Sequence, residues 1–447
     1  MIRRISPQRH SSNRQGSFGR GQRGFTLAEM VVSLIVLVQV ILVAMLLFQF
    51  NARVTRTQTR LAEMQQSLRV GHNEIIRLVR MAGRGGLPVT GPTGPVAATV
   101  TPPMGFALDV TNNVTAANQA VAANYTGTSP NAMLGTDILT VRGNFSSPQY
   151  YGGAVVLNDT PEDATAGTLL INRVTPQIPD QDLTTINEAI DNNVPEALLL
   201  FSGSPGEQYA VVELNPASST SDANTVTVAF TIIGNTRANA YRELWTNDAA
   251  ERFPIIDGSD VYVTVLEEYR FYIRNDSTSL TALEVRPRLS RARLMPNTGI
   301  PHGNPANLGT TAALTLATDI ADDIVDLQVA VAFDTPNAPA TPNADNIDRA
   351  IFESDNGAND DWLFNSLDDD ITDALWNDAD PANVPDAFYL RVSTLARTAG
   401  RDLQYEAPLL TFIEDHDYSS NVMLNSEVGR KYRRRALQTT VKLRNLG

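Results

Sequence analysis

The side chains that most often carry catalysis are few and scattered in this chain. Its 447 residues include no cysteine and only four histidines, His10, His72, His302 and His416. No two of these have the His-x-x-x-His spacing that would place two metal ligands on one face of a helix. No Gly-x-Ser-x-Gly segment, which would present a nucleophilic serine, is present either. We therefore expect no enzymatic activity and no cofactor.

An acidic segment at residues 355–361 is the best candidate for binding a cation. Its Asp and Asn side chains place oxygen atoms at alternate positions around Gly357, as calcium loops do. The closing glutamate of an EF-hand loop is missing at the expected position. We favour a solvated acidic loop, with calcium binding as the alternative, and assign no metal ligand.

Residues 23–30 indicate a different chemistry, the processing of the chain itself. Gly24 lies between a leader with six arginines and no acid and an apolar run at residues 31–50. A secretory signal has the opposite order, with its small-residue cleavage site after the apolar region. Cleavage after Gly24 would leave Phe25 as the first residue of a hydrophobic helix. The sequence therefore predicts processing between Gly24 and Phe25.

Glu29 is an ionisable residue just inside this apolar segment. Such a side chain costs about 2.5–3.5 kcal/mol in the middle of a bilayer, so one that is present usually has a partner. A free amino terminus, either that of Phe25 or that of a neighbouring subunit, is the natural partner. The alternative is a carboxylate that only reaches the membrane interface.

The long apolar segment positions this site in a membrane. About 20 apolar residues are enough to cross a bilayer as a helix, and residues 25–50 satisfy this requirement. The arginines of residues 1–24 favour a cytoplasmic leader, with the rest of the chain outside. The net charge of −14 is unsuited to nucleic-acid binding, which needs a basic face.

An amphipathic stem is predicted to continue the helix over residues 51–86. Apolar residues recur there at helical spacing, with charged residues between them. These apolar residues are Leu61, Met64, Leu68, Ile75 and Leu78. Gly71 is expected to mark a bend, and the glycines from Gly83 onward are expected to end the helix.

Residues 87–447 are predicted to form a β-rich head without disulfides. Segments rich in β-branched and aromatic residues predict antiparallel strands. They are residues 135–142, 209–214, 225–233, 261–273, 283–289, 328–333, 388–395 and 433–446. Residues 321–327 are expected to form a helical turn. Residues 87–131, 144–190 and 334–385 are expected to be loop-rich insertions. The predicted fold class is α+β, with a long N-terminal helix packed on an antiparallel sheet.

Gly24, Phe25 and Glu29, followed by the apolar helix, resemble the processing site of type IV prepilins and pseudopilins. Residues 80–83, 135–137, 321–329 and 433–445 are similar to the PilW family of minor pilins. This resemblance implies a pilin-like fold. It also implies that a membrane aspartyl peptidase cleaves after Gly24 and methylates Phe25. Glu29 would then pair with the amino terminus of a neighbouring subunit.

The same resemblance implies a structural role. The chain would reside in the bacterial inner membrane with its head in the periplasm, and then in a pilus at the cell surface. Its partners would be other minor and major pilins, the prepilin peptidase and the inner-membrane assembly platform. Two alternatives remain: a large pseudopilin at the tip of a type II secretion system, and an adhesin or binding module displayed on a pilin stem.

Overall fold

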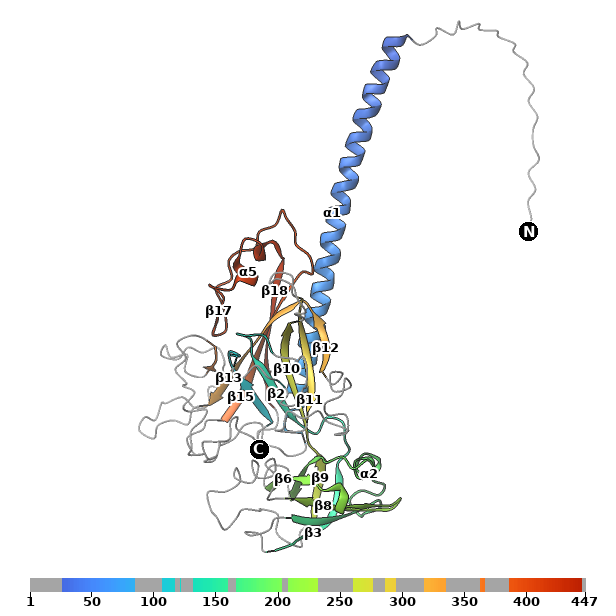
Figure 1. The fold of residues 1–447 in the computed structure, drawn as a ribbon, viewed down its shortest axis with the longest axis vertical. Coiled ribbons are helices and arrows are strands. Elements are labelled where there is room, and N and C mark those ends of the chain that lie inside the picture. Colours follow the sequence, from blue (N-terminus) through green and yellow to red (C-terminus); the bar gives the residue numbers. More distant parts are fainter. Residues whose placement is uncertain are drawn as a thin grey trace, which may run out of the picture. The chain divides into compact units, whose positions relative to one another are not determined.

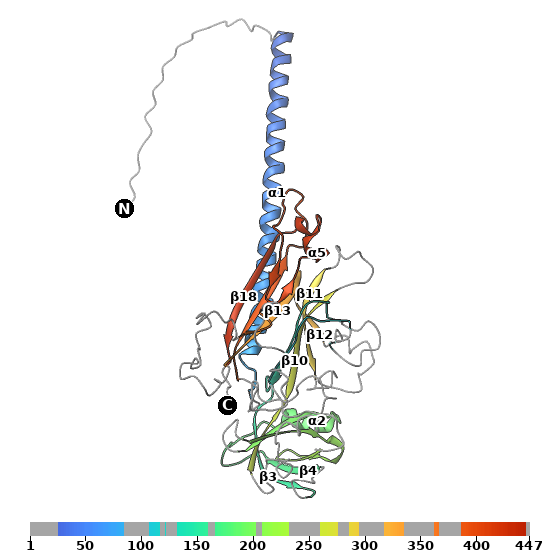
Figure 2. The same cartoon turned by 90° about the vertical axis from the view of Figure 1, so that its left-hand side faces the viewer.

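The computed structural model is described for eleven parts of the chain. They are residues 26–84, 107–116, 121, 132–159, 166–202, 208–231, 260–275, 286–294, 317–334, 362–365 and 386–443. The chain forms two compact units, residues 1–58 and 59–447, and each is described by itself. Figures 1 and 2 show the elements in two views at right angles.

One helix, α1 (Leu27–Val79), contains both the apolar run and the stem. Every residue from 26 to 50 is exposed. In the second unit α1 is amphipathic, and its buried residues are Met64, Leu68, Gly71, His72, Ile75, Ile76, Leu78 and Val79. A turn over residues 80–84 ends the helix, with Gly83 at a φ of 73°. The predicted helix is confirmed, although it ends several residues before residue 86.

The antiparallel pairing of the strands is as predicted, but the described head contains four sheets where the predicted fold had one. Two of these sheets share a core with α1. The first has the order β1-β2-β10-β11-β12 and the second the order β14-β13-β15-β18. The strands of the first are β1 (Leu108–Thr111), β2 (Ile138–Gly143), β10 (Glu267–Asn275), β11 (Pro287–Leu294) and β12 (Ala317–Asp322). Those of the second are β13 (Ile324–Asp334), β14 (Trp362–Leu363), β15 (Asp386–Arg397) and β18 (Arg434–Lys442).

The main core lies between α1 and these two sheets. The stem residues Leu68, Ile75 and Leu78 share one hydrophobic cluster with residues of both sheets. Gly71 is required there by close packing, because a Cβ at this position would lie 2.7 Å from Cδ2 of Leu289. No bend has to be invoked for this glycine, since α1 continues without interruption to Val79.

A closed barrel of six strands lies between β2 and β10 in the sequence. Its strands pair in the order β4-β3-β9-β5-β6-β8, and β4 also pairs with β8, which closes the ring. They are β3 (Tyr150–Leu157), β4 (Ala166–Asn172), β5 (Ala197–Ser202), β6 (Gln208–Leu214), β8 (Thr225–Thr231) and β9 (Asp260–Val265). Because the ring is closed, each of these six strands has a paired neighbour on both sides, and the two-residue strand β7 is added beside β8. The interior is a separate core that includes Ile171, Leu200 and Val228.

The barrel docks on the head through strand β5, whose two faces are both buried. Leu198 and Leu200 point into the barrel core, whereas Leu199 and Phe201 belong to the main core of the head. Successive strand residues point to opposite faces, so a strand buried on both faces must be apolar throughout. This explains the continuous run of apolar residues from 197 to 201.

The expectation of a loop-rich insertion at residues 144–190 is wrong. This segment contains β3, β4 and the helix α2 (Thr184–Asp191). Two adjacent glycines in β3 weakened the strand pattern, but one of them, Gly152, is needed for close packing between strands. A Cβ on Gly152 would lie 2.7 Å from Cδ1 of Leu169 on β4. A glycine inside a strand often marks such a close approach.

The helical turn expected at residues 321–327 is also wrong. β12 ends at Asp322 and β13 begins at Ile324, so Asp323 alone turns the chain from one sheet to the other. Asp323 has a φ of 59°, a left-handed conformation that Asp tolerates better than most residues. Similarly, the single strand expected over residues 261–273 is divided at Leu266 between β9 and β10.

Shorter elements complete the described parts of the chain. They are the 3-10 turns η1 (Pro216–Ser218) and η6 (Gly429–Lys431), the strands β7 (Thr220–Ser221), β16 (Phe412–Ile413) and β17 (His416–Asp417), and the helix α5 (Val422–Asn425). The expected insertions at 87–131 and 334–385 lie largely outside the described residues. Within them the structure describes β1 and β14.

Candidate functional site

The start of α1 has the hydrogen bonds of a capping box. The backbone N–H and the Oγ1 hydroxyl of Thr26 donate to Oε2 of Glu29, at 2.9 and 3.0 Å. In return, the N–H of Glu29 lies 3.3 Å from Oγ1 of Thr26. A Thr followed three residues later by Glu satisfies helix-terminal donors in this reciprocal way. Glu29 therefore has a local partner within its own chain.

The three predicted site residues are only partly placed. Gly24 and Phe25 lie outside the described residues, whereas Glu29 is exposed in the first turn of α1. Thr26 was not among the predicted site residues, although its Thr-x-x-Glu spacing to Glu29 is a signal that could have identified it. The carboxylate at this position can both cap its own helix and accept a second donor from outside, since a carboxylate has about four acceptor sites.

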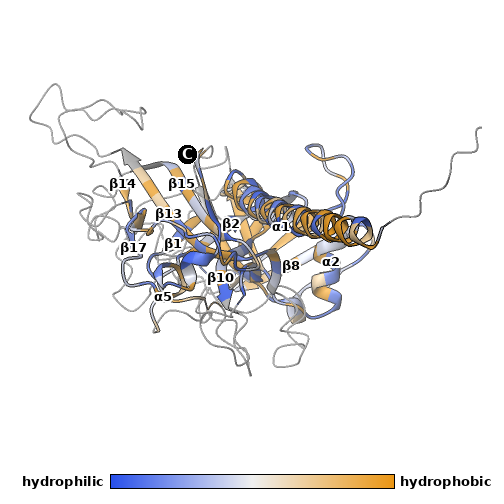
Figure 3. Ribbon diagram, turned by 90° about the horizontal axis from the view of Figure 1, so that it is seen from above, coloured by the Kyte–Doolittle hydropathy of each residue, from blue (hydrophilic) through white to orange (hydrophobic). Residues whose placement is uncertain are grey.

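The exposed half of α1 is the largest apolar surface in the described residues. Figure 3 shows α1 coloured mostly as hydrophobic. By length and composition the helix could cross a membrane, and its most apolar stretch is 0% buried. A helix that is apolar all round needs lipid or other helices around it. This half of α1 is therefore long and apolar enough to cross a membrane.

Two sequence segments that resemble pilin motifs contact each other in the head. The backbone N–H of Asp137 donates to the carbonyl of Leu327 at 2.9 Å, and the N–H of Val329 donates to Oδ2 of Asp137 at 2.8 Å. The side chain of Gln328 donates to the carbonyl of Gly135 at 3.1 Å. These bonds join β2 of the first sheet to β13 of the second. They explain why the polar residues Asp137 and Gln328 are buried at this junction.

Asp137 and Asp326 are fully buried in this contact. Burial raises the pKa of both carboxyl groups well above their usual range. Within the described residues, however, no three His, Asp or Glu side chains are grouped in a way that could hold a metal ion. The contact therefore connects the two sheets, and the calcium candidate at residues 355–361 lies outside the described residues.

His72 is buried in the interface between the stem and the second sheet. Its Nδ1 lies 3.0 Å from Oγ1 of Thr394, and its Nε2 lies 2.8 Å from Oγ1 of Thr439. Burial lowers the pKa of His72 from 6.5 to about 4. The folded protein thus keeps this imidazole neutral, whereas the unfolded chain would protonate it below pH 6.5.

We expect His72 to make the head less stable in acid. The stabilisation that the neutral, buried imidazole of His72 provides is complete above pH 6.5 and is lost as the pH falls to about 4. The free energy of unfolding should fall by about 2 kcal/mol between about pH 7.5 and pH 5. The measurement is the free energy of unfolding of a soluble fragment that begins at residue 52. In the variant His72→Gln the pH dependence should be weaker by that amount. Equal slopes for the two proteins would contradict this prediction.

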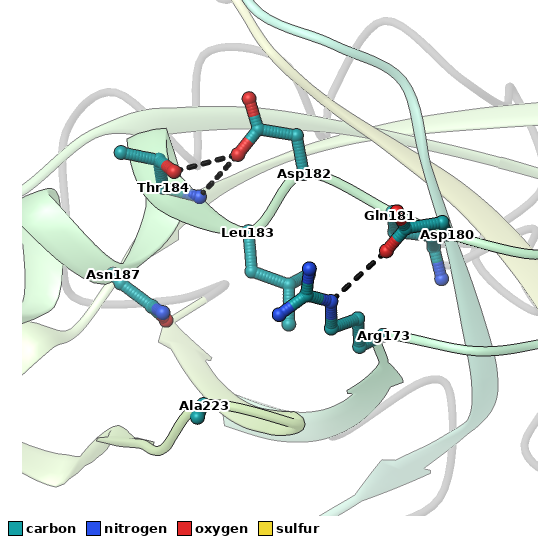
Figure 4. A pocket seen from close by; sticks show the side chains of 8 residues that line it. All are labelled: Arg173, Asp180, Gln181, Asp182, Leu183, Thr184, Asn187 and Ala223. Carbon is teal, nitrogen blue, oxygen red and sulfur yellow. Dashed lines mark hydrogen bonds and ion pairs between the residues drawn. The ribbon is translucent and has the colours of Figure 1, made fainter.

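The barrel carries a polar pocket of about 420 Å³ between β4, α2 and the β7–β8 turn (Figure 4). Nε of Arg173 donates to Oδ1 of Asp180 at 2.9 Å, and the hydroxyl of Thr184 donates to Oδ1 of Asp182 at 2.6 Å. This hydrogen bond lowers the pKa of Asp182. Oδ1 of Asn187 is buried without a hydrogen-bond partner in the described structure. These donors and acceptors could bind a neutral, hydroxylated molecule.

No protein-family model, curated protein or solved structure has a significant match to this chain. The resemblance to type IV prepilins therefore depends on the quoted sequence motifs.

Proposed function

We propose that this chain is a membrane-anchored filament subunit, a minor pilin of the PilW type, with a pilin-like fold. The observation that carries this proposal is the division of α1. Its first half is exposed on all sides, whereas its second half is packed into the core of a β-rich head. An exposed apolar helix can be covered by lipid before assembly and by neighbouring helices in a filament. The role is structural and non-enzymatic.

The proposed orientation follows from charge. The arginine-rich leader of residues 1–24 would stay in the cytoplasm, and the head would lie in the periplasm and later at the cell surface. The proposed partners are other minor and major pilins through α1, the prepilin peptidase, and the inner-membrane assembly platform. Head-to-tail contacts of this kind form open helical assemblies.

Replacing Gly24 with leucine should leave the precursor uncut. The physical reason is that a bulky side chain would obstruct the cleft of a membrane protease, whereas glycine has no side chain. Mass spectrometry of the wild-type N-terminus should find a chain that begins at a methylated Phe25. An intact Met1 on the mature protein, or a cleavage site beyond the apolar run, would show that the proposed processing does not occur.

A second candidate function is suggested by the barrel, which could be a binding module displayed on the stem. It is inserted between Gly143 and Glu267, which are directly paired in the sheet. The chain therefore leaves and re-enters the head at neighbouring positions. A large pseudopilin of a type II secretion system remains the other alternative, and the partners encoded by neighbouring genes would distinguish it.

Deleting residues 144–266 tests the role of the barrel. A two-residue Asn-Gly turn can join antiparallel neighbours such as β2 and β10. The deletion also removes Leu199 and Phe201 from the main core, so the shortened head should be less stable. We expect it still to be processed and to support pili, while attachment of cells to surfaces is lost. The amount of processed protein in membranes controls for misfolding. If pili disappear while the shortened protein accumulates normally, the barrel acts in assembly and the binding-module proposal is wrong.

A further inference from the structure

Basic residues are concentrated at the end of the head where β18 begins. We call them the basic patch, and they are Arg60, Arg401, Arg430, Lys431, Arg433, Arg434 and Arg435. Asp402 forms an ion pair with Arg433, and Glu406 forms ion pairs with Arg430 and Lys431. The acidic residues Glu63, Asp322 and Asp323 line a pocket together with Arg60. This excess of positive charge contrasts with the net charge of −14 of the whole chain. The side chains of Arg401 and Arg435 are exposed, and the described structure contains no ion pair for either.

Backbone hydrogen bonds bring the patch together from three parts of the chain. The N–H of Asp402 donates to the carbonyl of Lys431 at 2.8 Å, and the N–H of Ala407 donates to that of Arg430 at 2.7 Å. Nη1 of Arg60, on α1, donates to the carbonyl of Arg401 at 3.1 Å. The loop from 400 to 409 is therefore held between the stem and the start of β18.

Two large apolar side chains are exposed on this same loop. Leu403 is 78% exposed and Leu409 is 62% exposed. Leu409 directly follows Pro408, whose carbonyl accepts a hydrogen bond from Nη2 of Arg434 at 2.8 Å. The loop is ordered by its hydrogen bonds, so the leucines are held outward rather than exposed by fraying. Cationic side chains with adjacent exposed leucines are typical of surfaces that bind anionic membranes.

The covalent connection limits how far the patch can be from the bilayer. Ten residues of α1 separate Phe50, the last residue of the apolar run, from Arg60. Even fully extended, ten residues span at most about 33–36 Å. The patch therefore stays close to the membrane that the apolar run would cross.

We propose that the basic patch, with Leu403 and Leu409, docks on anionic phospholipid headgroups of the membrane that α1 crosses. This inference rests on the proposed membrane anchoring. The lipid surface fits better than the acidic surface of a second subunit, because it offers both phosphate groups and an apolar boundary for the leucines. Docking would hold the head at the membrane until the subunit is extracted into a filament.

The absence of cysteine allows a direct test on the full chain. A polarity-sensitive fluorophore is attached to Leu403→Cys, and the protein is reconstituted into vesicles that contain a lipid-borne quencher. We expect quenching to be at least about twofold stronger in vesicles of phosphatidylcholine with phosphatidylglycerol than in phosphatidylcholine alone. High salt should remove this difference in quenching between the two kinds of vesicle. The matched control is a label at Val156→Cys on β3, which is also exposed and should not be quenched in either vesicle.

A charge variant distinguishes docking from simple proximity to the membrane. Arg401→Glu combined with Arg435→Glu should reduce quenching at position 403 to the level in phosphatidylcholine. Equal quenching in both lipids, or no effect of the charge variant, would overturn the proposal. A change in emission that depends on protein density and not on the lipid would assign the patch to a neighbouring subunit.

Vesicle flotation distinguishes a failure of the proposed membrane anchoring from a failure of the proposed docking of the basic patch. If the full chain does not float with vesicles, membrane anchoring fails and the docking proposal fails with it. If the chain floats but the label at 403 is not quenched in phosphatidylglycerol vesicles, only the docking proposal is wrong.

Discussion

Replacing Arg142 with methionine should lower the free energy of unfolding by about 3–5 kcal/mol. The guanidinium is only 1% exposed, and its Nε donates to Oε2 of Glu268 at 2.7 Å. Asp109 lies 3.8 Å away, and burial raises the pKa of its carboxyl group. Removal of the cation would leave Asp109 without this partner in the core, and Glu268 would keep only its ion pair with Arg270, at 2.7 Å. The measurement is denaturant unfolding of the fragment that begins at residue 52.

Two variants serve as controls for this prediction. Arg173→Met breaks an ion pair with Asp180 that is largely exposed, and it should cost less than about 1 kcal/mol. The double variant Arg142→Met with Asp109→Asn should recover part of the loss, because it removes one of the two buried charges while Glu268 keeps its ion pair with Arg270, at 2.7 Å. If Arg142→Met costs no more than Arg173→Met, the buried pair does not stabilise the fold as we infer.

The Arg142–Glu268 ion pair also lies beside the junction where the barrel joins the head. Arg142 and Glu268 are direct partners across β2 and β10, one step from Gly143 and Glu267, where the barrel begins and ends. Oε2 of Glu267 accepts hydrogen bonds from the N–H groups of Phe145 and Ser146, at 3.0 and 2.8 Å. The base of the barrel is thus held by buried carboxylates, and we expect it to be rigid relative to the head sheet.

Replacing Glu29 with glutamine should reduce incorporation of the processed protein into filaments by at least about tenfold. Under the proposed function, the charge of Glu29 compensates a buried amine of a neighbouring subunit. Loss of one partner of a buried ion pair typically costs about 3–5 kcal/mol, and about 1.4 kcal/mol is enough for a tenfold change. Membrane insertion should persist, because the change removes a charge from an apolar segment. The measurement is the amount of processed protein in sheared pili relative to membranes.

Glutamine is the informative substitution because of the capping box at Thr26. Its side-chain oxygen can still accept the hydrogen bonds from Thr26, so only the charge is removed. Glu29→Ala removes both the cap and the charge, whereas Thr26→Ala weakens the cap and keeps the charge. We expect Thr26→Ala to be incorporated like the wild type. If Glu29→Gln is incorporated normally and Glu29→Ala is not, Glu29 acts only as a helix cap.

The main helix and most head strands could be predicted from local patterns. The stem positions Met64, Leu68, Ile75 and Leu78 are buried, as their spacing indicated. The final strand, β18, occupies the middle of the predicted segment at residues 433–446. These elements have one buried face, so their periodicity directly reflects their surroundings. The candidate site at Thr26 and Glu29 is equally local, since the two residues are three positions apart.

The wrong predictions concern elements whose surroundings are formed by residues far away in the sequence. The apolar spacing from Ala321 to Leu327 looked helical because both faces of β13 are buried, by two different clusters. The glycines of β3 resembled a loop because the reason for Gly152 is the side chain of Leu169 on another strand. Periodicity cannot distinguish a strand with two buried faces from a helix, or a close-packed glycine from a flexible one.

The sequence by itself determined that a long helix, apolar and then amphipathic, leads into a β-rich domain without disulfides. These features depend on residues close together in the chain, where side-chain periodicity and helix-ending glycines act directly. Only the tertiary structure decided that β4 pairs with β8 to close a barrel, that Asp137 joins two sheets through Val329, and that the loop at Leu403 lies beside Arg434. Such contacts join residues far apart in sequence. Each one depends on the geometry of the whole fold, and no local pattern specifies them.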